Sequence, residues 1–317
     1  MTDDHVTTGP LPSVSTDDIQ YLAEVPHLLV ALDFDGTLAG FSTDPLSVRM
    51  VPGARAAIDR LAGCSGTTVM LLSGRNLEIL EPVAEVTAVS SPSPGDILLV
   101  GSHGAEPADT AGSGLDEDQQ TLLATLAEKA DAYATLDPGM WVERKPFAVG
   151  LHIRGAADRR TGLTAYEEFR LAVQKLDGVT VTPGKDIVEV SVSPVTKGSY
   201  LQAYIDRDQP DAVIFAGDDV TDETALRVLD QQGLSPSGDS YPGRPDLGIR
   251  VGDGDTAAHR RLPDPDAVAA TLSRLAEARL LRQGDRDGGV VDAASVAALS
   301  ELREEPRSGQ GGSASAG

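Results

Sequence analysis

Two aspartates in the string DFDGTL at 33–38 could do chemistry, because they directly follow the apolar run 27–32. If that run is a buried strand, the carboxylates of Asp33 and Asp35 can both point into the crevice beyond its carboxyl end. One could attack a phosphorus atom and the other could transfer protons, while a shared hard cation screens their repulsion. The alternative is a strand that ends in an ordinary Asp-Gly turn. The full string directly after an apolar run favours a catalytic site over an ordinary turn.

A serine and a lysine further along the chain could bind phosphate oxygens. Ser73 begins the string SGR at 73–75, which follows the apolar run 67–72. Its hydroxyl and the free N–H groups of the turn could hold an anion, although an ordinary turn before a helix would look the same. Lys197 precedes a helical pattern, at a helix end where the dipole disfavours a cation. A bound phosphate would explain this lysine, and a lone surface lysine is the alternative.

Acidic residues are concentrated in the string GDDVTDE at 217–223, directly after the apolar run 212–216. Aspartate is a good helix N-cap, and acids in a first helical turn interact well with the dipole, so helix formation alone is one explanation. Four acids within six residues exceed what capping needs, and a bound divalent cation would explain the surplus. These acids are Asp218, Asp219, Asp222 and Glu223.

The elements that must position these groups are short apolar strands that alternate with helical patterns. Continuous apolar strands of this kind are typical of a parallel sheet covered by helices on both faces. Because ligands bind beyond the carboxyl ends of such strands, one sheet of this type would bring the four signals together. The predicted fold class is therefore α/β. The apolar runs lie at 27–32, 67–72, 96–100, 212–216 and 248–251, with a helix near 53–62.

Residues 140–192 have a different pattern, which indicates a smaller α+β unit inserted into the α/β domain. Apolar and polar residues alternate over 141–154 across a proline, a helix is predicted at 159–176, and a hairpin flanks the turn at 183–185. The acidic stretch 106–118 is a candidate linker into this unit. We therefore divide the chain into a poorly ordered segment at 1–25, a core domain at 26–105 and 193–282, a cap domain at 106–192, and a flexible tail at 283–317.

The formal net charge of this 317-residue chain is −23, which disfavours binding to nucleic acid and anionic lipid. The same field repels a phosphorylated metabolite, so a metal ion or a local group of basic residues must attract it. The single cysteine, Cys64, allows neither an internal disulfide nor a thiolate metal cluster. No run is long and apolar enough to cross a bilayer. We expect a cytoplasmic protein with a small-molecule substrate, without nucleic acid or membrane partners, and the sequence identifies no protein partner.

Taken together and in this order, the four signals resemble the motifs of the haloacid-dehalogenase superfamily of phosphotransferases. The match consists of D-x-D-G-T at 33–37, the strand-terminal Ser73, Lys197, and G-D-D-x-x-D at 217–222. Finer features resemble the trehalose-6-phosphate phosphatase family over about residues 28–275. They are SGR at 73–75, GSHGAE at 101–106, Lys145, HIR at 152–154, EV at 189–190 before KG at 197–198, and GDDVTDE at 217–223.

The resemblance implies a Rossmann-like core with a cap inserted between the Ser73 and Lys197 signals. It also implies hydrolysis of trehalose 6-phosphate through an aspartyl-phosphate intermediate. Asp33 would be the nucleophile, and Asp35 would protonate the leaving sugar oxygen and then activate water. The resemblance further implies that Thr37, Ser73 and Lys197 hold phosphoryl oxygens, and that Mg²⁺ is bound by Asp33, the backbone carbonyl of Asp35 and Asp218, with Asp219 and Asp222 in or near its shell.

Substrate choice is expected to depend on groups that meet the sugar hydroxyls, since every sugar phosphate shares the phosphate. His152 and Arg154 alternate with Ile153, so on a strand they share one face while Ile153 faces the core of the cap. Solvated charges on a strand face are the alternative explanation. The candidate binding residues are Arg75, His103, Gly104, Lys145, His152, Arg154 and Glu189.

Other functions remain open from the sequence. A phosphatase of sucrose phosphate or of mannosyl-phosphoglycerate would share the core motifs and differ in the cap. A mutase would use the same carboxylate pair. A non-catalytic sugar-phosphate sensor would keep the fold, although a sensor has no need of a nucleophile and an acid such as Asp33 and Asp35.

Overall fold

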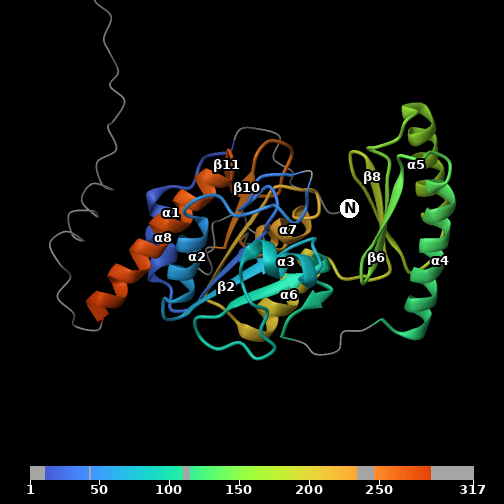
Figure 1. Cartoon of the computed structure of the whole chain (residues 1–317). Helices are drawn as coiled ribbons and strands as arrows, with labels where there is room; N and C mark the ends of the chain where they lie inside the picture. The colour runs from blue at the N-terminus through green and yellow to red at the C-terminus, as the bar shows by residue number, and fades with distance from the viewer. Residues whose placement is uncertain (1–10, 43, 110–114, 234–245, 287–317) are drawn as a thin grey trace, which may run out of the picture.

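The computed structural model describes residues 11–42, 44–109, 115–233 and 246–286, and it contains two separate sheets (Figure 1). The strands of the larger sheet have the order β11-β10-β9-β1-β2-β3-β4, and every neighbouring pair is parallel except β3 with β4. They are β1 (Leu28–Leu32), β2 (Thr67–Leu72), β3 (Ile97–Gly101), β4 (Glu106–Pro107), β9 (Ala212–Gly217), β10 (Leu247–Val251) and β11 (Arg260–Leu262).

Strand β1 lies in the middle of the larger sheet because all of its residues are apolar and buried. Leu32 at its end pairs with Leu71 of β2 on one side and with Ala216 of β9 on the other. This register places the carboxyl ends of β1, β2 and β9 side by side. The residues that follow these three strands therefore meet at one edge, and the predicted α/β fold with a parallel sheet is confirmed.

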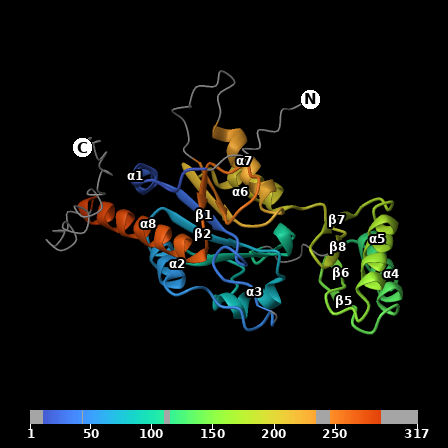
Figure 2. The same cartoon turned by 90° about the horizontal axis from the view of Figure 1, so that it is seen from above.

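Helices cover both faces of the larger sheet, as Figure 2 shows. Valine, leucine, isoleucine and alanine make up most of the two clusters between the sheet and its helices, in keeping with an aromatic content of 4%. One face packs against α1 (Thr16–Glu24), α2 (Ala54–Ala62), α3 (Leu77–Ala84) and α8 (Pro265–Arg286), and the other packs against α6 (Lys197–Asp208) and α7 (Glu223–Gly233).

The smaller sheet is antiparallel and forms the cap, with the strand order β5-β6-β8-β7. One face is covered by two helices, and Leu126 and Phe169 are fully buried between them and the sheet. In Figures 1 and 2 these helices lie on the side away from the core, so the other face of the sheet is turned toward the core. The elements of the cap are α4 (Glu117–Ala134), β5 (Trp141–Arg144), β6 (Ala148–His152), α5 (Arg159–Val173), β7 (Thr180–Pro183) and β8 (Ile187–Ser191).

The strand pairing moves the expected boundary between core and cap. We expected the cap to begin at residue 106, but Glu106–Pro107 forms β4, which pairs with β3 at the edge of the core sheet. We therefore propose a cap of residues 115–192, inserted between core segments at 11–109 and 193–286.

The expectation of little order over residues 1–25 is wrong for helix α1. Its N-terminus has a capping box, in which the side chains of Ser15 and Asp18 each accept a hydrogen bond from the backbone N–H of the other. Ile19 and Leu22 are buried in the core cluster. A capped N-terminus and a short apolar stripe therefore help to fold this polar segment onto the core.

The carboxyl-terminal part of the core also departs from expectation. We expected the run 248–251 to be the last strand, but β11 follows it and pairs with β10. Helix α8 continues to Arg286, past residue 283, where we expected the tail to begin. Most of the expected tail lies outside the described residues, and so do residues 1–10.

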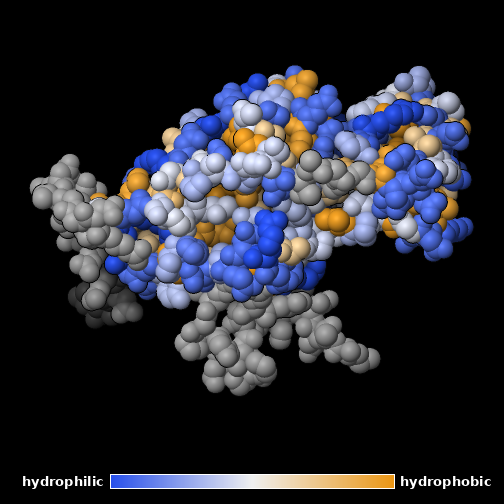
Figure 3. Space-filling model, turned by 90° about the horizontal axis from the view of Figure 1, so that it is seen from below, coloured by the Kyte–Doolittle hydropathy of each residue, from blue (hydrophilic) through white to orange (hydrophobic). Residues whose placement is uncertain are grey.

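The face of the molecule shown in Figure 3 is mainly hydrophilic. On the face shown in Figure 3, which grey atoms partly cover, hydrophobic residues form separate patches among hydrophilic ones on both the core and the cap. Across the described part of the chain, no helix combines the length and the hydropathy that a membrane span requires.

Candidate active site

Asp33 is the first residue after β1, and only 4% of it is exposed. Its backbone N–H donates to the carbonyl of Ala216 at 2.9 Å, which extends the pairing of β1 with β9 by one residue. Its carboxylate Oδ1 accepts a hydrogen bond from Nζ of Lys197 at 2.5 Å. The sheet therefore fixes the backbone of Asp33, and a buried cation fixes its side chain.

Lys197 is the first residue of α6, and its side chain is 1% exposed. The hydroxyl of Thr196 accepts a hydrogen bond from the N–H of Ser199, which fixes the start of the helix. Nζ of Lys197 lies 2.5 Å from Asp33 and 2.7 Å from Asp222. Burial lowers the pKa of Lys197, but these two carboxylates outweigh burial and raise it. Lys197 is therefore a charged member of a buried cluster and not a surface lysine.

Asp222 positions both Lys197 and the turn that contains Asp218. It is fully buried, and its Oδ1 accepts the hydrogen bond from Lys197. Its Oδ2 accepts hydrogen bonds from the backbone N–H groups of Asp218 at 3.0 Å and Asp219 at 2.9 Å. Because β9 ends at Gly217, this turn lies beside the end of β1, and its acids do more than cap a helix.

Three carboxylates at this edge could hold a metal ion, since Asp33, Asp218 and Asp222 each offer an oxygen within 4.8 Å of the others. Burial, and then the charges of Asp222 and Asp219, raise the pKa of Asp218 to about 7. Burial and Asp222 likewise raise the pKa of Asp33 well above its usual range, despite Lys197. The group therefore contains more negative charge than Lys197 balances. Its oxygen donors suit a hard divalent cation.

Gly36 allows the turn after β1 to approach Asp218 closely. Its φ is +78°, in the left-handed region, and a Cβ at this position would lie 2.1 Å from Oδ2 of Asp218. The neighbouring peptide includes the carbonyl of Asp35 that we expect to bind metal. Asp219 is exposed and its Oδ1 accepts from the N–H of Val220 at 2.6 Å, so it lies outside the group of three carboxylates.

Arg75 makes a bidentate ion pair with Asp35. Its Nε and Nη2 lie 2.5 and 2.7 Å from the two carboxylate oxygens. Its Nη1 donates to the backbone carbonyl of Pro45 at 2.6 Å. We expected Arg75 to bind substrate, and the structure places it on the candidate proton donor instead.

Thr37 and Ser73 have hydroxyl groups suited to phosphoryl oxygens. Thr37 is fully buried, and within the described chain its Oγ1 has no hydrogen-bond partner. An unpaired buried hydroxyl is costly, so it points to a ligand atom as its partner. Oγ of Ser73 accepts from the N–H of Arg75 at 3.1 Å and remains able to donate.

His103 lies on a strained turn, the 3₁₀ element η1 (Ser102–Gly104), directly after β3. Ser102 and His103 have φ values of +51° and +56°, which are unfavourable for residues with side chains. Their N–H groups donate to the carbonyls of Arg75 and Ser73 at 2.7 and 2.9 Å. The imidazole packs on Gly74, where a Cβ would lie 2.5 Å from its Cε1. The turn after β3 is thereby fastened to the turn after β2.

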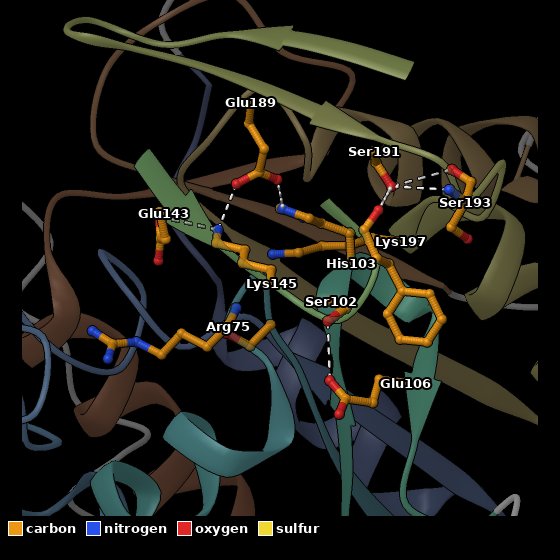
Figure 4. Close-up of polar contacts among 12 residues, drawn as sticks. Arg75, Ser102, His103, Glu106, Glu143, Lys145, Glu189, Ser191, Ser193 and Lys197 are labelled. Carbon is orange, nitrogen blue, oxygen red and sulfur yellow. Dashed lines mark hydrogen bonds and ion pairs between the residues drawn. The ribbon is translucent and has the colours of Figure 1, made fainter. Parts of the chain in front are cut away.

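Charged residues of the cap form a chain that reaches His103 of the core (Figure 4). Nζ of Lys145 lies 2.5 Å from Oε2 of Glu189, whose Oε1 lies 3.5 Å from Nε2 of His103. Oε2 of Glu143 lies 3.9 Å from Lys145 and 3.0 Å from Nε2 of His152. Acidic and basic groups thus alternate across the face of the cap sheet that is turned toward the core.

The pKa of Glu189 reflects this coupling. Burial raises it, but interactions with His103 and Lys145 outweigh burial and lower it to about 2. Burial lowers the pKa of Lys145, and Glu189 and Glu143 outweigh that effect and raise it. Both side chains therefore stay charged. They offer a carboxylate acceptor and an ammonium donor of the kind that binds sugar hydroxyls.

His152 and Arg154 occupy different surroundings, although we expected them to share one face. His152 ends β6, and its ring stacks on Trp141 with 3.7 Å between ring centroids. Ile153 is fully buried in the cap cluster. Arg154 is exposed beyond the end of β6 and does not line the cavity between cap and core. Gly104 is buried against Tyr200 of α6 and does not line that cavity either.

A cavity of about 610 Å³ lies between core and cap, within the size range of small-molecule sites. Several of the predicted residues line it, from both the core and the cap: Asp33, Asp35, Arg75, His103, Lys145, Lys197, Asp218 and Asp219. Glu189 lies behind Lys145 and His103, which it contacts.

Comparison with known proteins identifies the family of this chain. Residues 31–255 match the model of the family described as trehalose-phosphatase. The chain belongs to the trehalose-phosphatase family. The matched residues include the DFDGTL string, the cap and the acidic string GDDVTDE. These are the parts that form the site.

Relatives within this family are similar over most of the described chain. A trehalose-phosphate phosphatase of Mycobacterium ulcerans is 35% identical over 268 residues, which are 80% of this chain and 62% of the relative. One of Mycobacterium avium is 35% identical over 265 residues, which are 79% of this chain and 62% of the relative. The chain therefore spans less than two thirds of the length of these relatives.

Solved structures of fungal proteins have the same fold. The C-terminal domain of Candida albicans trehalose-6-phosphate phosphatase superposes with a TM-score of 0.69 at 22% identity, covering 85% of this chain and 99% of that one. A trehalose-6-phosphate phosphatase of Aspergillus fumigatus gives a TM-score of 0.59 at 24% identity, covering 84% and 99%.

Some residues that line the cavity in this trehalose-phosphatase family member were not predicted. Glu143 is two residues before Lys145, and strand alternation alone could have placed both on one face. No feature of the sequence indicated that Phe41 would line the cavity, because this depends on the path of the chain after β1. The unpredicted residues are Phe41, Pro45, Gly74, Asn76, Ile79, Glu143, Arg144, Gly184, Lys185 and Thr221.

Proposed function

We propose that this chain hydrolyses trehalose 6-phosphate to trehalose and phosphate through an aspartyl-phosphate intermediate. The observation that supports this most is the buried group of Asp33, Lys197, Asp218 and Asp222 at the carboxyl edge of the sheet. Phosphoryl transfer depends mainly on positioning and on compensation of charge, and this group offers both. The relatives named as trehalose-phosphate phosphatases support the choice of sugar.

Asp33 acts as the nucleophile in this proposal. A carboxylate oxygen of Asp33 forms a bond to phosphorus while the bond from phosphorus to the sugar oxygen breaks. Water then attacks phosphorus, the bond to Asp33 breaks, and the carboxylate and inorganic phosphate are released. The covalent intermediate divides one difficult step into two easier ones.

Asp35 transfers the protons of both steps. It gives a proton to the leaving sugar oxygen and later takes one from the attacking water. The bidentate contact from Arg75 holds the carboxylate of Asp35 in one orientation at the end of β1. A phosphate group also suits the same guanidinium, so we expect Arg75 to meet the phosphate of a bound substrate.

The phosphoryl oxygens are held by Lys197, Thr37 and Ser73. Lys197 provides a buried positive charge beside the nucleophile. The unpaired hydroxyl of Thr37 gains a partner in the bound phosphate, and Ser73 donates its remaining hydrogen. The energetic effect is large because a charge-assisted contact in a site that excludes water is only weakly screened.

We propose that Mg²⁺ is bound by Asp33, Asp218 and the backbone carbonyl of Asp35, with Asp222 and Asp219 beside them. When bound, the ion neutralises charge on the nucleophile and on the phosphoryl oxygens. Asp222 serves this site by fixing the backbone of Asp218 and by orienting Lys197.

A substrate panel tests the proposal. Phosphate release in the presence of Mg²⁺ is measured for trehalose 6-phosphate, sucrose 6-phosphate, mannosyl-phosphoglycerate and glucose 6-phosphate. We expect the highest kcat/KM with trehalose 6-phosphate. Asp33→Asn should lower it by at least about 10³-fold, since an amide is not a competent nucleophile here. Asp211→Asn is the matched control, because Asp211 directly precedes β9, at the opposite edge of the sheet.

Each alternative gives a different result in the same panel. Faster hydrolysis of another sugar phosphate would support a phosphatase activity but reject trehalose 6-phosphate as its preferred substrate. Conversion of one sugar phosphate into an isomer would indicate a mutase. Calorimetric binding of trehalose 6-phosphate without turnover by the wild type would indicate a sensor.

A further inference from the structure

The cavity between core and cap has two unlike walls. On the cap side it is lined by charged groups, which include Glu143, Lys145 and Lys185. On the core side, beside the charged groups of the candidate active site, it is also lined by three apolar residues, Phe41, Pro45 and Ile79. We call these three residues the apolar wall. A ligand that fits must therefore be polar along one side and apolar along another.

Phe41 is the member of this wall whose position the fold does not explain. It is 78% exposed, whereas Phe34, Phe169 and Phe215 are fully buried. The chain has only five phenylalanines, so a nearly free aromatic ring at the mouth of its candidate active site is unusual. Exposed apolar surface in a binding cleft commonly serves a ligand.

Pro45, four residues after Phe41 in the sequence, is held at the candidate active site. Nη1 of Arg75 donates to the carbonyl of Pro45, while the rest of its guanidinium binds Asp35. Further along the chain, Arg49 donates to the carbonyls of Leu46 and Val48 at 2.8 and 2.7 Å. Pro45 of the apolar wall is therefore held by the same guanidinium that binds the candidate proton donor Asp35.

A pyranose ring matches these two walls. Its edges have hydroxyl groups, which suit the charged cap side, and its faces consist of C–H groups, which pack on an aromatic ring. The phosphate of a sugar phosphate is fixed at Asp33 and Lys197. The first ring leaves from beside Asp35, and a second ring has to extend toward the rim of the cavity.

We propose that Phe41, supported by Pro45 and Ile79, is the platform for the C–H face of the second sugar ring of a disaccharide phosphate. This inference rests on the proposed sugar-phosphate phosphatase function. It assigns the preference for a disaccharide over a monosaccharide to the core, in addition to the hydroxyl contacts of the cap. Phe41 is thus a specificity-determining residue that takes no part in the bond-making steps.

The test compares two substrates in four proteins. kcat/KM is measured for trehalose 6-phosphate and glucose 6-phosphate in the wild type, Phe41→Ala, Phe41→Tyr and Tyr21→Ala. Tyr21 is the matched control, an aromatic residue on α1 that is 48% exposed and does not line the cavity. We expect Phe41→Ala to lower kcat/KM for trehalose 6-phosphate about tenfold, or about 1.4 kcal/mol, chiefly through KM. In Phe41→Ala, kcat/KM for glucose 6-phosphate should change less than about twofold. In Phe41→Tyr and Tyr21→Ala, kcat/KM for both substrates should also change less than about twofold.

Inhibition by the products gives a second readout. In Phe41→Ala, trehalose should bind about tenfold more weakly as a competitive inhibitor, while inhibition by inorganic phosphate stays unchanged. An equal loss for both substrates, or unchanged inhibition by trehalose, would overturn the platform and assign Phe41 to folding or cap movement.

Failure of the platform can be told apart from failure of the proposed function. If the wild type prefers trehalose 6-phosphate but Phe41→Ala keeps that preference, the function stands and the platform is rejected. If the wild type instead prefers sucrose 6-phosphate, trehalose 6-phosphate is rejected as the substrate. The platform is then tested by the ratio of kcat/KM for sucrose 6-phosphate to kcat/KM for glucose 6-phosphate, compared between Phe41→Ala and the wild type. If the wild type treats glucose 6-phosphate as well as any disaccharide phosphate, or hydrolyses none of them, the platform is rejected too.

Discussion

At the scale of single residues, the environment of Lys197 in the fold differs from the environment that its position in the sequence suggests. As the first residue of a helix it looks like a surface lysine, yet its ammonium group is buried between Asp33 and Asp222. A buried charge is tolerated only with such partners. The cluster is therefore both a structural and a chemical unit, and a change to one member should affect stability as well as turnover.

Lys197→Ala should test both effects. Removal of the cation leaves two buried carboxylates without their partner, and we expect a loss of about 3–5 kcal/mol in the free energy of unfolding in the absence of metal. kcat/KM for trehalose 6-phosphate should fall by at least about tenfold, since a charge-assisted contact to phosphate is lost. Urea unfolding and steady-state kinetics measure the two. Lys129→Ala, at an exposed position of α4, is the control, and wild-type behaviour in Lys197→Ala would contradict the assigned role.

The pKa of Asp218 predicts a pH dependence of metal binding. Because burial and neighbouring acids raise this pKa to about 7 in the metal-free protein, Mg²⁺ has to displace a proton below that pH. The apparent affinity for Mg²⁺ should fall about tenfold for each pH unit below about 7 and should level off above it. Calorimetry at pH 6 and pH 8 measures this, and an affinity independent of pH would contradict it.

The same pKa fixes the sign of the stability change in the metal-free protein. A carboxyl with a raised pKa binds more protons when folded than when unfolded, so its effect destabilises the fold as pH rises from about 4 to about 7. Added Mg²⁺ should offset this loss. A metal-free protein that gains stability over that range would show that other groups dominate.

At the scale of elements, the cap strands sort the predicted sugar-binding residues into two groups. Lys145 and Glu189 belong to the chain of charges that reaches His103, whereas Arg154 lies beyond the end of β6. The sequence pattern of alternation placed His152 and Arg154 together because it assumed a strand of greater length. The strand ends at His152, so Arg154 lies outside it.

Glu189→Gln and Arg154→Ala should therefore differ. Glu189→Gln removes the nearer of the two carboxylates beside Lys145, and we expect kcat/KM for trehalose 6-phosphate to fall at least about tenfold. Arg154→Ala should change it by less than about twofold, as is usual for an exposed charge. Steady-state kinetics of the two variants, with para-nitrophenyl phosphate as a substrate that lacks the sugar, make the comparison. Equal losses in both variants would contradict the division drawn here.

An element could be predicted where a local sequence pattern defines it, and could not where pairing with a distant segment defines it. The strands β1, β2 and β9 are continuous apolar runs, so both the strands and the residues beyond their ends could be predicted. The strands β4 and β11 are short and are defined by pairing with a neighbour, which no local pattern reveals. Helix α1 did have a local signal, the Ser15–Asp18 capping box, within a segment whose composition suggested disorder.

The same distinction applies to the candidate site. Asp33, Ser73, Lys197 and Asp218 follow strands or begin a helix, so their meeting at one edge follows from topology. The pair of Arg75 with Asp35 could not be predicted in this way, because topology brings the turns after β1 and β2 together but does not determine which of their side chains pair.

At the scale of the whole molecule, the described chain contains separate hydrophobic clusters for core and cap. The cluster of the cap includes Leu126, Phe169 and Val188, and it shares no buried residue with the two clusters of the core. Each part can therefore be weakened on its own. The candidate metal site belongs to the core alone, whereas the cavity needs both parts.

Phe169→Ala should separate the two parts. Truncation of this fully buried ring should destabilise the cap by about 3–5 kcal/mol. Hydrolysis of trehalose 6-phosphate should decline with the cap, while Mg²⁺ affinity of the core, measured by calorimetry, should stay within about twofold of the wild type. Leu163→Ala, at an exposed position of α5, is the control. Loss of Mg²⁺ binding in Phe169→Ala would show that core and cap unfold together.

The insertion of the cap also has a consequence for the order in which the chain is made. β1 is fully buried between β2, which precedes the cap in sequence, and β9, which follows it. Until the ribosome has synthesised the whole cap, α6 and β9, one edge of the fully apolar strand β1 has no neighbour. Such an edge is a template for wrong pairing with other nascent chains. The hydrophobic cluster of the cap contains only residues that precede α6, so the cap can fold during this interval, before β9 exists.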